Sequence, residues 1–206
     1  MSERPAEGVP ADFPLETVAL EMDLSIPKGL LGEQEFYKTV LLDSQWTMEP
    51  HRPQPDDEEI DYWIHLPGRP VNILWWQIKT IFELRLIHDT HIAHFFLAKK
   101  LENLFTHPRM WYFLAYFDEA LRTFRDPVFV VPATFLHSLG VPIARDRVRI
   151  EVYASMEPDS KDQWAPFRTS VHGIADRINE IFQNLPPETP EQHLAFERRT
   201  GLRLAS

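Results

Sequence analysis

The chain has 206 residues, of which 44% are hydrophobic and 25% are charged, and it contains no cysteine. The missing thiols exclude disulfides, thiolate metal sites and cysteine nucleophiles. The formal net charge of -10 is concentrated in residues 1–70, which hold 15 acidic and 5 basic side chains. No apolar run reaches the roughly 18 residues of a membrane-spanning helix, so we expect a cytoplasmic protein.

Prolines divide the chain into three parts. Residues 1–14 hold Pro5, Pro10 and Pro14 among few apolar side chains, which predicts a flexible N-terminal arm. We expect residues 15–186 to form a single α+β domain, a common size for one hydrophobic core. Residues 187–206 have few apolar anchors and are expected to be a loosely packed C-terminal tail.

The first half of that domain is predicted to be strands. Apolar and polar residues alternate over 18–26 and again over 60–66, and even spacing of apolar residues over 36–48 suggests a further strand. Residues 71–87 are rich in β-branched and aromatic residues at period 2, which favours a long strand, with a helix as the alternative.

Helices are expected to follow. Apolar residues recur at helical spacing over 90–106 and over 108–121. Further along, we expect a buried strand at 128–131, one or two helical turns at 132–139, a strand at 147–154 and a helix at 169–185. The predicted fold class is therefore α+β: an antiparallel β-meander in the N-terminal half, two packed helices, a further strand and a C-terminal helix.

A histidine cluster is the first candidate site. His88, His91 and His94 follow one another at i, i+3 and i+6, beside Asp89. Imidazole and carboxylate groups are ligands that divalent transition metals favour. On a helix the first and third histidines would diverge by about 120°, so at most two could bind one ion. The alternative is a structural junction in which Asp89 caps the following helix.

Aromatic and acidic residues form the second candidate site, one for a partner protein. If Trp76 points into the core of an alternating strand, Trp75 must point outward, and Trp63 and Trp111 lie in similar clusters. An acidic run would present charge to a basic partner surface. That run consists of Asp56, Asp57, Glu58 and Glu59.

These observations favour a non-catalytic protein-interaction module, a subunit, adaptor or inhibitor of a complex, with no cofactor. One alternative is a metal-dependent hydrolase or oxygenase that binds a divalent transition metal through His88, His91 and His94. The other is a carrier of an apolar small molecule. The acidic charge argues against nucleic acid as a partner, since Arg145, Arg147 and Arg149 are the only concentrated basic feature.

Overall fold

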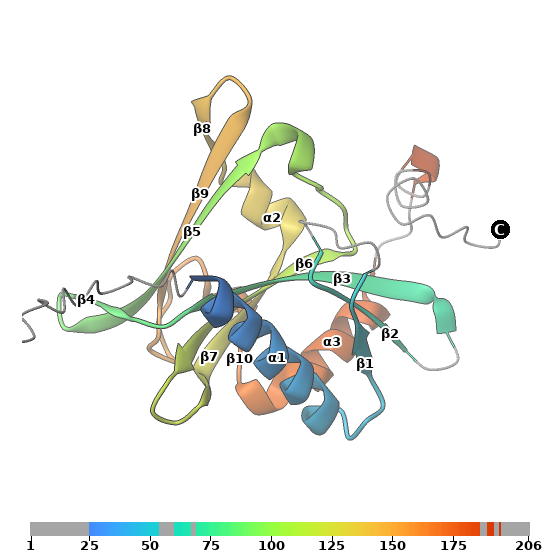
Figure 1. Cartoon of the computed structure of the whole chain (residues 1–206), viewed down its shortest axis with the longest axis horizontal. Coiled ribbons are helices and arrows are strands. Elements are labelled where there is room, and N and C mark those ends of the chain that lie inside the picture. The colour runs from blue at the N-terminus through green and yellow to red at the C-terminus, as the bar shows by residue number, and fades with distance from the viewer. Residues whose placement is uncertain (1–24, 54–59, 67–68, 186–188, 192–193, 195–206) are drawn as a thin grey trace, which may run out of the picture.

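A computed structural model describes residues 25–53, 60–66, 69–185, 189–191 and 194. These residues form a mixed α+β structure built mainly from strands, which are arranged in two sheets. Figure 1 shows the strands of the smaller sheet rising from the larger one on the side away from helices α1 and α3. No helix in these ranges is long and apolar enough to cross a membrane.

The larger sheet has six strands in the order β1-β2-β3-β6-β7-β10. Their bounds are β1 Glu49–His51, β2 Tyr62–Leu66, β3 Arg69–Ile81, β6 Met110–Asp118, β7 Thr123–Pro132 and β10 Arg168–Thr169. The central pair β3 and β6 is parallel, and the other neighbours are antiparallel. The sheet is therefore mixed, and the predicted antiparallel meander is wrong at its centre.

The smaller sheet has four antiparallel strands in the order β4-β5-β9-β8. Their bounds are β4 Arg85–Ile87, β5 Thr90–Lys100, β8 Val141–Ala144 and β9 Arg147–Ser155. The pairing of β5 with β9 runs from Ile92↔Ser155 to Lys100↔Arg147, so these two strands form the sheet's long axis.

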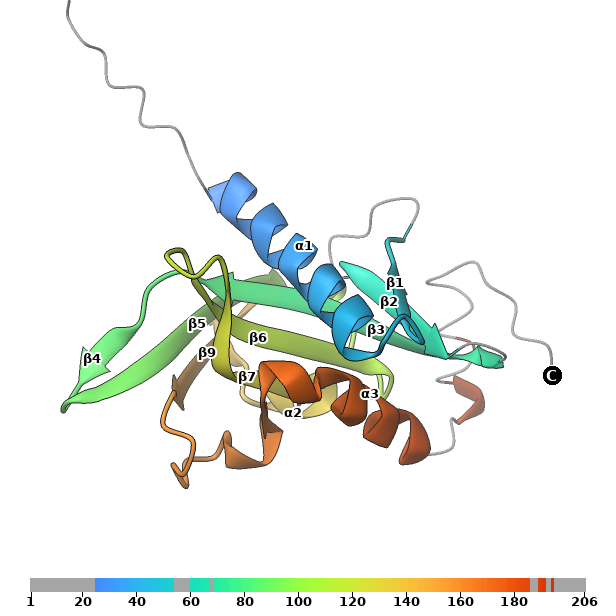
Figure 2. The same cartoon turned by 90° about the horizontal axis from the view of Figure 1, so that it is seen from below.

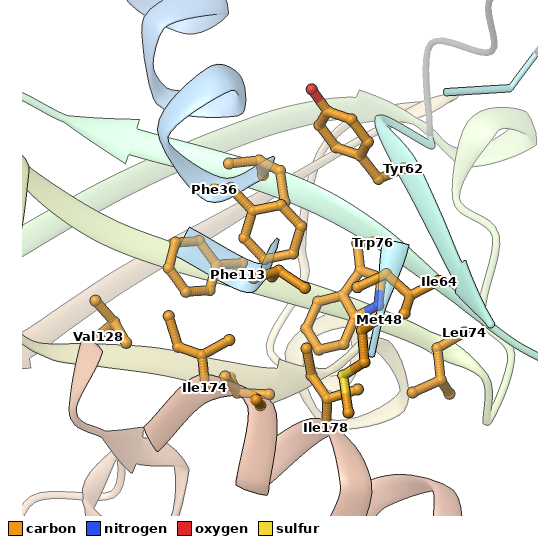
Figure 3. Packing of buried hydrophobic residues seen from close by; sticks show 14 of the residues in the cluster. Phe36, Met48, Tyr62, Ile64, Leu74, Trp76, Phe113, Val128, Ile174 and Ile178 are labelled. Carbon is orange, nitrogen blue, oxygen red and sulfur yellow. The ribbon is translucent and has the colours of Figure 1, made fainter. Parts of the chain in front are cut away.

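Two helices cover one face of the larger sheet. They are α1 (Ser25–Asp43) and α3 (Ile174–Gln183), the latter preceded by the 3-10 turn η3 (Val171–Gly173). Figure 2 shows both helices on the same side of β3 and β6. Figure 3 shows the buried hydrophobic side chains that pack between the helices and the strands. Phe36 of α1 packs on Trp76 and Phe113, with ring centroids 5.7 and 4.8 Å apart. Burial of such aromatic surface is the main stabilising contribution on this face.

The opposite face packs against the smaller sheet and the short helix α2 (Ala133–Ser138). Two further 3-10 turns, η1 (Leu101–Asn103) and η2 (Ala165–Phe167), lie on the connections around it. Trp75, Tyr112 and Leu114 point to this side and are buried against Phe95, Ile150 and their neighbours. Both faces of β3 and β6 are therefore covered.

Helix α1 replaces the strand predicted at 36–48. The strand expected at 18–26 falls mostly outside the described residues, and its last two residues belong to α1. The strand expected at 36–48 is helical up to Asp43. Phe36 and Val40 are four apart, a spacing that fits a strand face and a helix face equally well. Leu42, which only a strand would bury, is 58% exposed.

The two helices predicted at 90–106 and 108–121 are strands β5 and β6. Ala93 and Leu97 again satisfy both periods, but the buried Phe95 between them fits only a strand. Strand β6 lies between β3 and β7 and is covered on both faces, so Tyr112 to Ala115 are all buried and show no alternation. A fully buried strand and a buried helix cannot be separated by periodicity alone.

Most of the remaining elements agree with expectation. The strand at 60–66 is β2 and the strand at 147–154 lies within β9. The segment 71–87 is not one long strand: β3 ends at Ile81, and β4, which begins at Arg85, belongs to the smaller sheet. Residues 128–131 lie in β7, 132–139 contain α2, and the helix expected at 169–185 begins at Ile174. The predicted arm at 1–14 and most of the tail at 187–206 lie outside the described residues.

Candidate functional site

Asp61 is a carboxylate held against the centre of the larger sheet. It precedes β2 and extends the β2–β3 ladder, because its N–H donates to the carbonyl of Trp76 at 2.9 Å. The N–H of Ile78 donates to its Oδ2 at 2.5 Å. Burial raises the pKa of Asp61 above its ordinary value. The positive charges of Lys79, Lys99 and Arg52 and the hydrogen bond from Ile78 lower that pKa, but their effect is smaller.

Gln77 and Lys79 of β3 lie on the face that the smaller sheet covers. The paired register of β2 and β3 ends at Tyr62↔Trp76, and Asp61 lies at the bend just before it. Alternation along β3 sends Trp76 and Ile78 toward the helices and Gln77 and Lys79 to the other side. Gln77 is 2% exposed, and its Oε1 accepts a hydrogen bond from Lys99 Nζ at 2.5 Å. An amide oxygen and two ammonium groups therefore lie on one face, and the charges of both lysines act on the Asp61 carboxylate.

A basic pocket adjoins these residues. It is open, encloses about 380 Å³, and lies between β3 and the ends of β5 and β9. Its described lining holds four basic side chains and no acidic one. The lining residues are Gln77, Lys79, Ala98, Lys99, Lys100, Asn103 and Arg147. In a chain with a formal charge of -10, this is a local reversal of sign suited to a bound anion.

A hydrogen-bonded chain lies behind Lys99. The Lys99 ammonium stands 5.9 Å from the centre of the Tyr112 ring. The Tyr112 hydroxyl pairs with His137 Nε2 at 2.9 Å, and His137 Nδ1 pairs with Thr106 Oγ1 at 2.7 Å. Burial, assisted by the charge of Lys99, lowers the pKa of His137 to about 4. The ring is uncharged at neutral pH and positions the Tyr112 hydroxyl without adding charge.

Three flat rings lie together on one face of strands β1 and β2. His51 stacks on Trp63 with ring centroids 4.2 Å apart, and His65 lies 5.2 Å from His51. All three are half-buried. Burial lowers the pKa of His51, an effect to which His65 adds and which Glu49 opposes.

The predicted histidine site does not come together. His88 and Asp89 form the two-residue turn between β4 and β5, both with positive φ, so Asp89 caps no helix. His91 is exposed, and His94 stacks on Tyr153 with centroids 4.3 Å apart. An odd spacing on a strand directs His91 and His94 to opposite faces. Within the described ranges, no group of three histidine, aspartate or glutamate side chains could hold a metal ion.

The predicted partner-binding residues are also scattered. Trp75 is 1% exposed, so its outward position is wrong; the smaller sheet and its loops cover the face that it occupies. Trp111 packs on the helix-side core, and Trp63 is half-buried in the ring stack. The acidic run Asp56, Asp57, Glu58 and Glu59 lies outside the described residues.

Sequence reasoning missed Asp61, Gln77 and Lys79. They stood on the polar side of two alternating strands, and that side was assigned to solvent. The available signal was a carboxylate one residue before a short strand, together with a glutamine and a lysine within a strand as apolar as β3. This sequence pattern indicates a functional site only when a second sheet is known to cover that face.

The chain has few matches among known proteins. No protein-family model matches the chain, and no curated protein matches it. Among solved structures, that of a bacterial homing endonuclease is similar, with a TM-score of 0.45 and 14% identity. The match covers 76% of this chain and 96% of the endonuclease. A likeness of this size assigns no activity to the chain.

Two predictions are nevertheless corrected at this point. The endonuclease comparison stands against a non-catalytic interaction module and against the exclusion of nucleic acid, and neither is kept. The exclusion of nucleic acid relied on the net charge of the whole chain. The basic pocket shows that four cationic side chains lie together on this acidic chain. The carrier of an apolar molecule stays an untested prediction.

Proposed function

We propose that the protein is a phosphodiester hydrolase acting on nucleic acid, with Asp61, Gln77 and Lys79 at its reaction centre. The observation that carries this is a basic pocket whose described lining holds four cations, together with a largely buried carboxylate, Asp61, that is near enough to Lys79 and Lys99 to be affected by their charges. A phosphodiester is an anion that such a pocket attracts, and its hydrolysis needs positive charge where negative charge develops.

Each residue is assigned a role that follows from the chemistry of its side chain. Lys79, Lys99 and Arg147 supply the positive charge that holds the phosphates. Lys79 is also the strongest positive influence on Asp61, so a phosphate beside that carboxylate would lie within reach of the same ammonium group. The hydrogen bond from Lys99 fixes the amide of Gln77 in the wall of the pocket.

Asp61 carries the carboxylate oxygens that Mg²⁺ prefers, whereas the amide oxygen of Gln77 already accepts a hydrogen bond from the Lys99 ammonium group. Magnesium sites in phosphoryl-transfer enzymes commonly use one or two carboxylates together with the substrate's own phosphate oxygens. One aspartate therefore fits such a site, and the ion would be recruited together with the substrate. When bound, the ion would neutralise phosphate charge and lower the pKa of a water molecule.

The test is cleavage of labelled single-stranded and duplex oligonucleotides by the full chain, with Mg²⁺ or with EDTA. We expect cleavage that requires Mg²⁺ and is lost in the Asp61→Asn and Lys79→Ala variants. Lys161→Ala is the matched control, because Lys161 is exposed and is not among the described residues that line the basic pocket. Equal activity in Asp61→Asn and the unmodified chain would reject the proposal.

A further inference from the structure

We propose that the rings of Trp63, His51 and His65 form a stacking platform for a nucleobase, and that the nucleic acid taken by this site is therefore single-stranded. The proposal rests on the proposed function and adds to it the substrate's strandedness and a contact for its bases.

The pairing of strand β1 with strand β2 brings the three rings together. On β1 and β2, His51 lies opposite Trp63, and Glu49 lies opposite His65. Directly opposed residues share a sheet face, so the three rings lie together on the face away from helix α1. The centroids form a compact triangle, with separations of 4.2, 5.2 and 5.5 Å.

The platform and the basic pocket lie along the same face of β3. Along β2, Trp63 and His65 are two residues apart, which is about 7 Å. Trp63 lies opposite Trp75 of β3, and Gln77 and Lys79 follow Trp75 at every second residue. The rings and the lysine thus lie along one face of the strands, and Asp61 lies just before β2.

This order matches the chemistry of an extended nucleotide chain. Phosphates on the lysine side would lie in the positive pocket, and the base next to the phosphodiester at Asp61 would reach the rings. Proteins that bind single strands combine a positive groove with aromatic side chains on which bases stack. In a duplex the bases are already stacked and paired, so their flat faces are not open to a side chain.

The His51 ring suits a stacking role more than a charged one. Burial lowers the pKa of His51, so that its ring is uncharged at neutral pH. His51 Nε2 and His65 Nδ1 are buried and make no hydrogen bond in the described part of the chain. The three rings stack on one another and are only half-buried, so a nucleobase would add to this stack while the phosphates bind the lysines.

The experiment separates bases from phosphates. The full chain carrying Asp61→Asn is titrated with three labelled ligands, and affinity is read from fluorescence anisotropy. The ligands are a short thymidine oligonucleotide, an oligonucleotide of equal length in which every position lacks its base, and the thymidine strand paired with its complement. Thymidine and abasic strands carry the same phosphates, so any difference between them reports on the bases.

We expect the thymidine strand to bind roughly 5- to 150-fold more tightly than the abasic strand, the range for stacking of one base. Adding Trp63→Ala should abolish this preference and leave the abasic affinity unchanged, while Trp63→Phe should keep most of it. Thermal melting of both variants verifies folding, and the phenylalanine variant keeps the test decisive if the alanine variant unfolds.

Two results would overturn the proposal. One is an equal loss of affinity for the thymidine and abasic strands in Trp63→Ala, which would make Trp63 a structural residue. The other is tighter binding of the duplex than of the thymidine strand. Hydrolysis is measured separately on the unmodified chain, so cleavage without base preference rejects only the platform, and base preference without cleavage rejects only the hydrolase.

Discussion

The two faces of strand β3 differ in what they bury. Trp76 and Ile78 face helices α1 and α3 and belong to the apolar core on that side. Gln77 and Lys79, on the other face, meet a carboxylate and Lys99 at the edge of the smaller sheet. A polar residue in a doubly covered strand costs desolvation unless it is paired. The comparison teaches that both faces of this sheet bury an apolar core, and that the face beneath the smaller sheet also buries Gln77 at some cost in stability.

The largest expected effect concerns the polar face. Asp61→Asn should lower the rate of oligonucleotide cleavage by roughly 10²- to 10⁴-fold, the range for loss of a group that acts directly in the reaction. Gel analysis of labelled products over time measures it. Lys161→Ala in parallel should retain the full rate, and a comparable loss in that control would indicate a nonspecific effect of charge.

On the apolar face the expected loss is in stability. Phe36→Ala removes a ring that packs on Tyr62, Trp76 and Phe113 and should cost about 3–5 kcal/mol in the free energy of unfolding. Urea denaturation followed by tryptophan fluorescence measures the change. A cost below about 1 kcal/mol would mean that this ring contributes little to the stability of the fold.

Replacing two different aspartates with asparagine should change the melting temperature in opposite directions. Burial raises the pKa of Asp61, so ionising it costs stability; the cost is absent below about pH 3.8 and complete above the raised pKa. Asp61→Asn should therefore raise the melting temperature at pH 7, and the gain should vanish in acid. Scanning calorimetry at several pH values follows both effects.

Asp162→Asn is the matched control for that gain. The Asp162 carboxylate accepts hydrogen bonds from Arg168 at 2.7 Å and from the N–H groups of Ser155 and Trp164, both at 2.9 Å. Charge-assisted bonds of this kind contribute about 1.5–3 kcal/mol, so this variant should melt lower. If both variants shifted in the same direction, the assigned cost of Asp61 would be wrong.

Two glycines of α1 test how closely the helix lies on β3. A Cβ at Gly32 would stand 2.1 Å from Thr80 Oγ1, whereas a Cβ at Gly29 would meet nothing within 4 Å. Gly32→Ala should cost about 1–3 kcal/mol through overpacking. Gly29→Ala should be neutral or stabilise by up to about 1 kcal/mol, because alanine favours helix. Equal effects in chemical denaturation would contradict the close contact.

The smallest expected effect is a pH dependence. The pKa of His137 is lowered to about 4 from 6.5, so the unfolded chain binds the proton more readily. Stability should be complete above about pH 6.5 and fall as the pH drops toward 4, by roughly 1–2 kcal/mol after allowance for partial exposure. Urea titrations at pH 7 and pH 5 measure it, and His137→Gln should show a smaller difference between them.

Prediction from the sequence worked where one pattern admits one structure. Strict alternation identified β2 and β9, and the amphipathic pattern before Pro186 identified α3. It failed at α1 and β5, where Phe36 with Val40 and Ala93 with Leu97 are spaced by four and fit either period. Asp61 and Lys79 were missed because their role depends on the smaller sheet, whose strands come from distant parts of the chain.

The most direct test of the central claim is the Mg²⁺-dependent cleavage rate of a labelled oligonucleotide, measured for the unmodified chain and for Asp61→Asn alongside their melting temperatures. Loss of cleavage in a variant that melts at or above the unmodified protein would show that Asp61 serves the reaction at the expense of stability. Undiminished cleavage by Asp61→Asn, or cleavage that persists in EDTA, would contradict the assignment of the reaction to this face of the sheet.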